Sequence, residues 1–309
     1  MIVALAGGVG GAKLAAGLAT VLPPEELLIA VNVGDDFEHL GLTVCPDLDT
    51  VTYTLAGIAN RTQGWGLEGE TWNFMAMLRD LGGEDWFNLG DRDMALHVLR
   101  TQRLKTQTLS TVTADIAASL GIRHRIAPVS DDPVRSMVET DEGELAFQDY
   151  FVRRRCEPRF LSIRYDRADA ATPSPALAEA FSNPALEAII ICPSNPFLSI
   201  GPILAIPGIR RALESRRVPV VAVSPFIGGK AVKGPAAKIM NERGFEATPS
   251  AVVDYYAGLL DGLVIDHADA ALPCTGPAIL ADDTLMRDAA DRERLARITL
   301  DFARSLRAR

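Results

Sequence analysis

The chain has 309 residues, and 48% of them are hydrophobic, which is enough for one large core or two smaller ones. Its net charge of -9 argues against broad binding to nucleic acid or to an anionic membrane. The apolar start is too short for a signal peptide, no apolar run reaches membrane-spanning length, and the cysteines are widely spaced. We therefore expect a cytoplasmic globular protein with reduced thiols.

The first predicted element is a short apolar strand at 2–6, followed at once by a glycine-rich turn and a helix. This order brings backbone N–H groups and a helix N-terminus together, where they can hold a phosphate. The turn matches neither G-x-G-x-x-G nor G-x-x-x-x-G-K-[ST]. It still favours phosphate or nucleotide binding over a purely structural turn, with the lysine either neutralising phosphate charge or lying in solvent. The candidate residues are Gly7, Gly8, Gly10, Gly11 and Lys13.

A second buried strand is predicted at 27–33, and it ends in an acidic turn with Asp35 and Asp36. Ligands of open parallel sheets bind beyond the carboxyl ends of the strands, so this turn and the glycine loop should be neighbours. The two carboxylates could hold a ribose hydroxyl or a metal, or they could cap local N–H groups.

Two further acids, Asp47 and Asp49, precede a helical pattern at 51–59. One of them would be explained by a role as the helix N-cap. Carboxylate oxygens are also the ligands that magnesium prefers, and the acidic turn with Asp35 and Asp36 should be close by. The sequence therefore favours a metal or substrate-hydroxyl role for Asp49 over pure capping.

Residues 61–180 interrupt the alternation of strands and helices, which predicts an inserted mixed α/β lobe. A charge-rich turn in this stretch leads into a helix, so Asp91 and Arg92 could cap that helix or bind a polar ligand. Asp93 and His97 have the i, i+4 spacing of a possible metal pair, but a packed histidine is favoured.

The second half of this lobe predicts a hairpin at 134–139 and 144–147, with an acidic glycine turn between the two strands. Arg153 and Arg154 follow it in a run of arginines. Such a run is usually a solvated turn, but it is also a candidate clamp for the carboxylate or phosphate of a substrate.

The strand and helix alternation returns after the lobe, with strands at 186–191 and 218–223 and a charged amphipathic helix at 283–308. Both strands end in polar loops that are rich in proline or glycine, which indicates a continuous edge for a ligand. Ordinary loop chemistry is the alternative. The candidates for base, ribose or phosphate contacts are Ser194, Asn195, Ser224, Gly229 and Lys230.

These elements predict a Rossmann-like α/β fold, with three layers around a mostly parallel sheet. Residues 1–60 and 181–309 would form the nucleotide-binding core, and residues 61–180 the inserted lobe.

Several stretches of the sequence together resemble one family. GGVGGAKL, NVGDD, CPDLDTVTYTLAGI, LGDRDMALHVLRTQ, PSNPFLSIGPIL and SPFIGGKAVKGPAAKIM occur in the order found there, and the resemblance spans nearly the whole chain. On these motifs the chain is similar to the 2-phospho-L-lactate transferase family (CofD or FbiA) of deazaflavin coenzyme F-420 biosynthesis.

The resemblance implies a phosphotransferase of the EC 2.7.8 class that acts on small molecules and is a homodimer. A guanosine diphosphate ester of a three-carbon acid would donate its phosphorylated acid to the hydroxyl of the deazaflavin Fo (7,8-didemethyl-8-hydroxy-5-deazariboflavin). GMP would leave, and magnesium would assist. The acid could be 2-phospho-L-lactate, phosphoenolpyruvate or 3-phosphoglycerate, and the sequence does not choose among them.

The resemblance also implies roles for individual residues. Asp49 would lie at the Fo hydroxyl or at the metal, and Asn88, in the turn with Asp91 and Arg92, would lie along the Fo site. The glycines of the first loop would take the diphosphate, and Ser194 with Asn195 the nucleotide side.

Two other classes of protein compete with this interpretation. One is a non-catalytic, nucleotide-sugar-binding regulator of the gluconeogenesis-factor type, which shares a glycine loop and a related fold. The other is a dinucleotide-dependent oxidoreductase, which the missing G-x-G-x-x-G pattern and the lack of an evident proton-relay histidine disfavour.

Overall fold

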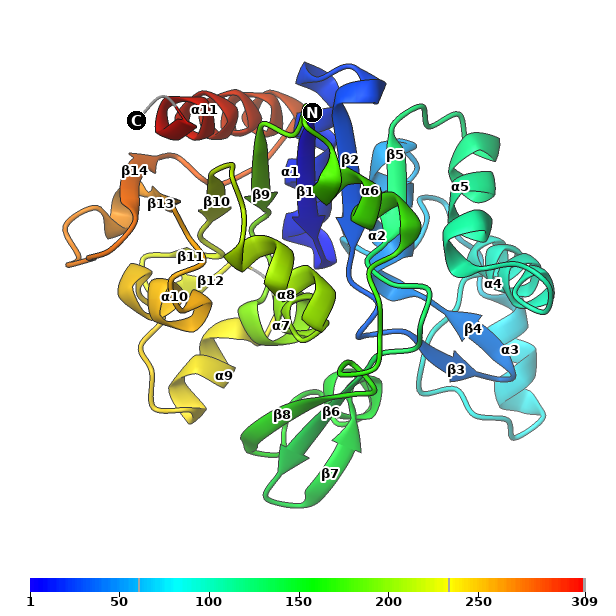
Figure 1. Ribbon diagram of the computed structural model, residues 1–309. Coiled ribbons are helices and arrows are strands. Elements are labelled where there is room, and N and C mark those ends of the chain that lie inside the picture. The colour runs from blue at the N-terminus through cyan, green and yellow to red at the C-terminus, as the bar shows by residue number, and fades with distance from the viewer. Residues whose placement is uncertain (61, 233, 308–309) are drawn as a thin grey trace.

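The computed structural model describes residues 1–60, 62–232 and 234–307 (Figure 1). Its centre is a seven-stranded sheet in which every neighbouring pair of strands is parallel. In spatial order the strands are β14 Ala278–Asp282, β13 Gly262–Asp266, β10 Val220–Val223, β9 Ala188–Ile191, β1 Ile2–Ala6, β2 Leu27–Val31 and β5 Arg125–Pro128. The predicted Rossmann-like α/β class is confirmed.

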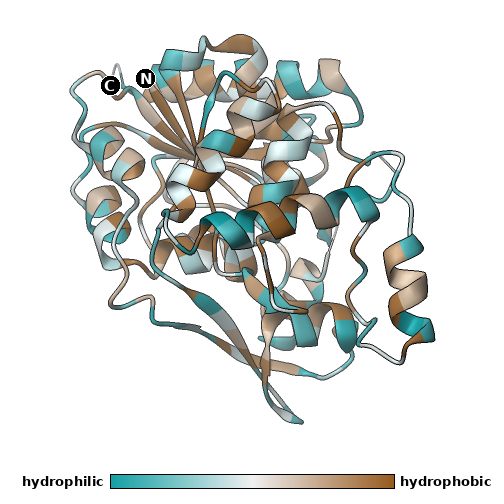
Figure 2. Cartoon of the chain, turned by 90° about the vertical axis from the view of Figure 1, so that its right-hand side faces the viewer, coloured by the Kyte–Doolittle hydropathy of each residue, from teal (hydrophilic) through white to brown (hydrophobic). Residues whose placement is uncertain are grey.

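The central strands are built almost entirely from apolar residues, and β1, β2, β9 and β10 are buried along their whole length. Strands of this kind need cover on both faces, and helices supply it. Figure 2 shows the strands as a hydrophobic fan inside the molecule, with hydrophilic residues on the outer helices. The covering helices are α1 Gly8–Val21, α2 Pro46–Leu55 and α11 Ala289–Arg307 on one face, and α6 Pro175–Ser182 and α8 Pro207–Glu214 on the other.

The order of the strands sets the place of the site. From β1 the chain builds outward through β2 and β5, and it returns much later to the other side of β1 with β9. The loops after β1 and β9 therefore diverge over a crevice at the carboxyl ends of these two strands. A crevice at such a switch in strand order is the usual ligand site of open α/β sheets.

The other elements lie around this sheet. The predicted hairpin is confirmed as β6 and β7, and β8 joins it to form a three-stranded antiparallel sheet that projects from the body of the molecule (Figure 1). These elements are β6 Arg135–Thr140, β7 Gly143–Ala146, β8 Phe160–Asp166, the hairpin β3 Phe37–His39 with β4 Leu42–Val44, the hairpin β11 Phe226–Ile227 with β12 Lys230–Ala231, and the helices α3 Asn73–Asp80, α4 Asp91–Arg103, α5 Leu109–Ser119, α7 Gly201–Leu204, α9 Ala236–Glu242 and α10 Pro249–Tyr256.

Short helical turns complete the chain, and they are η1 Pro24–Glu26, η2 Asp149–Arg153, η3 Pro196–Ile200 and η4 His267–Asp269. The division into a core of 1–60 and 181–309 and a lobe of 61–180 stays a prediction. Strand β5 of the main sheet comes from inside the stretch assigned to the lobe, and residue 61 lies outside the described residues. No described helix is both long and apolar enough to span a bilayer.

Helix α2 differs from the sequence prediction in a way that affects the site. It begins at Pro46, with Cys45 as its N-cap, so neither Asp47 nor Asp49 is the capping residue. Both acids lie in the first turn of the helix, where their carboxylates are favoured by the helix dipole and point into neighbouring structure.

The contact between α1 and α11 gives a stability prediction. A Cβ atom at Gly17 would overlap the backbone carbonyl of Arg292. We expect Gly17→Ala to lower the free energy of unfolding by about 1–3 kcal/mol, because the two helices must move apart. Urea unfolding measures this, with Thr20→Ala on the exposed side of α1 as a control that should change stability by less than about 0.5 kcal/mol. Equal stabilities of the two variants would contradict the close packing.

Candidate active site

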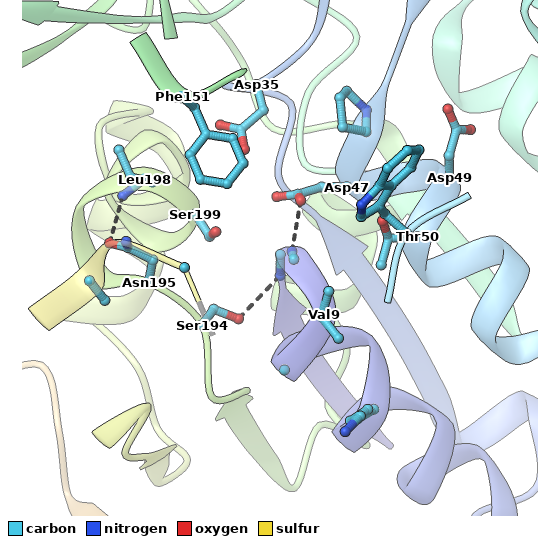
Figure 3. A pocket seen from close by; sticks show the side chains of 18 of the residues that line it. Val9, Asp35, Asp47, Asp49, Thr50, Phe151, Ser194, Asn195, Leu198 and Ser199 are labelled. Carbon is cyan, nitrogen blue, oxygen red and sulfur yellow. Dashed lines mark hydrogen bonds between the residues drawn. The ribbon is translucent and has the colours of Figure 1, made fainter. Parts of the chain in front are cut away.

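A cavity of about 690 Å³ opens beyond the carboxyl ends of the central strands. Its described lining comes from the β1–α1 junction, the start of α2, α4, η2 and the loops after β9 and β10. This size suits a nucleotide or a cofactor-sized ligand. Figure 3 shows how the side chains of Asp35, Asp47, Ser194 and Ser199 gather around the N-terminus of α1.

The glycine loop is compressed against the loop that follows β9. A Cβ atom at Gly10 would overlap the backbone carbonyl of Pro193, and the amide of Gly7 donates to Ser194 Oγ at 3.3 Å. Gly8 has a φ of 63°, in the left-handed region that favours glycine. The glycines are therefore required by packing and backbone conformation as well as by any ligand.

Asp47 occupies the N-terminus of α1. Its Oδ1 accepts the Gly8 amide at 2.7 Å (Figure 3), and its Oδ2 accepts from Asn32 Nδ2 at 3.0 Å. Asn32 is held in turn by the Gly34 amide, which donates to its Oδ1. Burial raises the pKa of Asp47 to about 6, against the opposing effect of these hydrogen bonds. The carboxylate thus already uses an amide that was expected to meet a phosphate.

Asp35 also lines the cavity, and its Oδ1 has no hydrogen-bond partner among the described residues. Burial, then the charges of Asp47 and Asp36, raises the pKa of Asp35 well above its usual range. Asp36 lies outside the cavity lining, with its side chain hydrogen-bonded to Cys45. The structure therefore brings Asp35 and Asp47 together at the cavity and separates Asp36 from them.

Buried Asp36 gives a prediction on the pH dependence of stability. Burial raises its pKa to about 7, so between roughly pH 4 and pH 7 the folded protein holds a proton that the unfolded chain has lost. This carboxyl therefore makes the protein less stable as the pH rises through that window. Asp36→Asn should therefore reduce the decrease in the free energy of unfolding over this pH window by about 2–4 kcal/mol. Urea unfolding at pH 4.5 and 7.5 measures it, and parallel profiles of variant and wild type would contradict the assignment.

Asp49 belongs to a separate buried cluster. Both of its oxygens accept from the Arg100 guanidinium, the Nη1 contact being 3.1 Å. His97 lies between this pair and Asp93, whose carboxylate also accepts from the Tyr53 hydroxyl. Burial tends to raise the pKa of Asp93, but hydrogen bonding and charge from His97, with smaller contributions from Tyr53 and Arg100, bring it below its usual value.

One oxygen or nitrogen atom from each of Asp49, Asp93 and His97 lies within 4.8 Å of the other two, which is close enough for the three to share a metal ion. The positive charge of Arg100 already neutralises Asp49 and would repel a cation there. In Figure 3 the carboxylate of Asp49 points away from Asp47. Asp49 is a lining residue whose carboxylate is already bound to Arg100, so Asp35 and Asp47 form the better metal-binding pair.

The residues predicted for the nucleotide side divide into two groups. Ser194, Asn195 and Ser224 line the cavity. Asn195 and Ser224 also stabilise their own loops, as when Asn195 Oδ1 accepts the amides of Phe197 and Leu198, whereas Ser194 accepts the Gly7 amide of the glycine loop. Lys13 lines the cavity and donates to the Met286 carbonyl at 2.7 Å, whereas three predicted residues are absent from the described lining. They are Gly11, Gly229 and Lys230.

Of the three turn residues predicted for the Fo site, Asn88, Asp91 and Arg92, only Asn88 is part of the described cavity lining. Asp91 accepts from Thr71, Asn73 and the Phe74 amide, which fixes the start of α3. Arg92 donates to the Glu68 carbonyl at 2.6 Å. These two charges are used in local structure and do not reach the cavity.

The two arginines predicted as a donor-acid clamp also lie outside the cavity lining. Arg153 pairs with Asp149 at 3.1 Å and lies over the Trp86 ring at 4.4 Å, and Arg154 pairs with Glu142 on the surface. The structure thus does not bring Arg153 and Arg154 to the site.

Aromatic rings form a part of the cavity that the sequence did not reveal. Trp65, Phe87, Phe147 and Phe151 line it, and the Phe147 and Phe151 rings stack at 5.4 Å. Trp65 and Phe151 are 45% and 39% exposed, although only 6% of the chain is aromatic. Exposed rings gathered at one cavity are typical of a site that binds a planar ligand.

The chain is similar to known proteins over nearly its whole length. The model of the family "2-phospho-L-lactate transferase CofD" matches residues 2–291. The chain is 44% identical to a phosphoenolpyruvate transferase of Kitasatospora aureofaciens over 99% of its own length and 98% of that protein's. It is 38% identical to a 2-phospho-L-lactate transferase of Methanosarcina mazei, over 97% of this chain and 99% of that one.

The fold has a solved counterpart in a UPF0052 family protein of Bacillus halodurans, with a TM-score of 0.60 and coverage of 97% and 98% of the two chains. At 15% identity this likeness concerns the fold alone. The family match and the curated relatives extend over nearly the whole sequence and include the glycine loop, the acids of α2 and the loops that close the cavity. The chain therefore belongs to the 2-phospho-L-lactate transferase CofD family.

Proposed function

We propose that the protein transfers a phosphorylated three-carbon acid from a guanosine diphosphate ester to the terminal hydroxyl of the deazaflavin Fo and releases GMP. The observation that carries the proposal is the single cavity in which a helix N-terminus, a group of carboxylates and exposed aromatic rings meet. Such a cavity can hold a diphosphate, a hydroxyl and a planar ring at once. Family membership supports a transferase.

Phosphoenolpyruvate is the acid we favour. The relatives that are named phosphoenolpyruvate transferase reach 44% identity, and those named 2-phospho-L-lactate transferase reach 40%. The difference is small, so 2-phospho-L-lactate and 3-phosphoglycerate belong in the same test.

In this proposal the donor lies across the switch in strand order. Its diphosphate approaches the N-terminus of α1 and displaces Asp47 from the Gly8 amide, and its guanosine lies beside the loops that carry Ser194 and Ser224. The ring of Fo lies against the aromatic part of the cavity near Trp65, and its terminal hydroxyl reaches Asp49.

The charges of the cavity support a divalent cation such as magnesium. Its described lining carries four carboxylates, at Asp35, Asp47, Asp49 and Asp93, and one lysine, Lys13. Arg100 neutralises Asp49, but a diphosphate ester with a free carboxylate would still be repelled by the other acids unless a cation came with it. Asp35 and Asp47 fit that ion, because both are hard oxygen donors and one Asp35 oxygen has no hydrogen-bond partner among the described residues. When bound, the ion would neutralise the diphosphate and the departing GMP.

The reaction needs one bond formed and one broken. The acceptor oxygen forms a bond to the phosphorus that carries the acid, and the bond from this phosphorus to the bridging oxygen breaks, so that GMP leaves with the electron pair. Asp49 accepts a hydrogen bond from the acceptor hydroxyl, directs it at the phosphorus and receives its proton. The N-terminus of α1 holds the phosphate in line.

Mass spectrometry of products tests the proposal. The protein is incubated with Fo, magnesium and the guanosine diphosphate ester of each of the three acids. The expected products are GMP and Fo joined through a phosphodiester to the acid, formed fastest with phosphoenolpyruvate. Binding of a nucleotide sugar without turnover of any of the three esters would instead support a regulatory protein.

A further inference from the structure

Helix α4 presents three buried polar side chains on one face. Asp93, His97 and Arg100 are spaced i, i+4 and i+7, and their exposed fractions are 9%, 1% and 3%. They meet Asp49 and Tyr53, which have the i, i+4 spacing on α2. Five polar groups thus form one cluster between two helices.

The contact with Arg100 indicates the tautomer of His97. Arg100 Nη1 can only donate a hydrogen bond, and it lies 3.3 Å from His97 Nδ1, so this nitrogen is the acceptor. The proton of the neutral ring is then on Nε2, which lies 3.4 Å from Asp93 Oδ1. Tyr53 donates to the same Asp93 oxygen and holds that carboxylate in place.

We propose that Arg100 and His97 are positioning residues that fix the direction of the Asp49 carboxylate in the cavity. This inference rests on the proposed function, because it takes Asp49 as the group that meets the acceptor hydroxyl. Two guanidinium nitrogens contact the two carboxylate oxygens, so the carboxylate cannot rotate without losing a contact. His97 Nδ1 lies 3.3 Å from Nη1, the same guanidinium nitrogen that donates to Asp49 Oδ2, and so helps to hold it in place. Each carboxylate oxygen keeps a second lone pair for the substrate.

A purely structural ion pair would explain less of this geometry. Buried ion pairs often add no stability compared with apolar residues of similar volume, so stability alone does not call for a cluster of five polar groups. Four of the five, Asp49, Tyr53, Asp93 and His97, line the cavity, while Arg100 lies behind them. In this arrangement Arg100 lies behind the cavity lining, and Asp49, the carboxylate that it holds, is part of the lining.

Two substitutions of His97 separate its two contacts. Asn places a carbonyl oxygen near the Nδ1 position and keeps the contact with Arg100, whereas Gln places an amide nitrogen near Nε2 and keeps the contact with Asp93. We expect His97→Asn to retain kcat within about 10-fold and His97→Gln to lower it about 100-fold, with the donor KM unchanged in both. A purely structural role predicts no such difference in kcat between the folded variants, and a kcat of His97→Gln equal to or above that of His97→Asn would overturn the proposal.

Arg100→Lys provides the second measurement. Lysine keeps the charge but cannot span both carboxylate oxygens, so we expect kcat to fall about 100-fold while affinity for GDP stays at the wild-type value. Arg103→Lys is the matched control, since Arg103 lies on the same helix and pairs with Asp115 at the surface. Unchanged kcat in folded Arg100→Lys would overturn the proposal. Turnover of Fo by the wild-type protein is measured first, so that failure of the proposed function is seen separately from failure of this inference.

Discussion

Asp49→Asn is expected to lower kcat by at least about 1,000-fold and to leave the affinity for GDP within a factor of about three. The amide that replaces the carboxylate can still accept one hydrogen bond from Arg100, but it is a very weak proton acceptor. The acceptor hydroxyl would then lack both its orientation and the group that receives its proton. Steady-state kinetics with Fo and the guanosine ester measures the loss.

The same substitution should also destabilise the protein. Arg100 is 3% exposed and would lose its counter-ion, and an unpaired buried charge costs about 3–5 kcal/mol. The kinetics must therefore be measured at a temperature where circular dichroism shows folded variant. A kcat within 10-fold of wild type in folded protein would remove Asp49 from the chemistry.

Removal of divalent cations is expected to weaken GDP binding by about 100-fold in the wild-type protein, and Asp47→Asn is expected to abolish most of that difference. Asp47 accepts a hydrogen bond of 2.7 Å from the Gly8 amide, and the buried carboxylate of Asp35 lies next to it. Without a cation, the diphosphate must displace one negative charge and approach another. The Asn variant presents an amide there, so repulsion falls with or without the ion.

Isothermal titration calorimetry with GDP, in magnesium and in EDTA, measures all four affinities. Asp115→Asn, which removes a surface carboxylate outside the cavity lining, is the control and should keep the wild-type dependence on magnesium. Equal GDP affinity of the wild-type protein in magnesium and EDTA would reject the cation. A full magnesium effect in Asp47→Asn would instead assign the cation to other residues.

Local patterns account for the parts of the fold that the sequence predicted well. The strand, glycine turn and helix at the N-terminus are contiguous, and the apolar runs of β1, β2, β9 and β10 are typical of central parallel strands. Edge strands carry a weaker signal. β5 ends in Pro128 and β14 is only partly buried, and the sequence pattern predicted neither.

The start of α2 could in principle have been predicted from the sequence. Pro46 is at the first helical position, where proline is favoured, and this places Asp47 and Asp49 inside the first turn. The polar face of α4 could likewise have been predicted from the spacing of Asp93, His97 and Arg100. What the spacing could not give was the partner, because the contact of Arg100 with Asp49 joins two helices that are distant in sequence.

Charges in loops were the least predictable part of the site. Asp91 and Arg153 looked as suitable for a ligand as Asp47 did, since nothing in the sequence says which partner a charge will find. In the structure the first is satisfied by the start of α3 and the second by Asp149 and Trp86. The selection among candidate charges is made by tertiary packing.

The contact between the Gly7 amide and Ser194 joins segments 187 positions apart. Because a chain emerges from the ribosome N-terminus first, the glycine loop is synthesised long before the serine that completes it. Until β9 arrives, β1 also has an open edge on that side, which a chaperone or another chain could occupy. The glycine loop therefore reaches its final packing only late in synthesis, when β9 and Ser194 have left the ribosome and the two halves of the sheet can join.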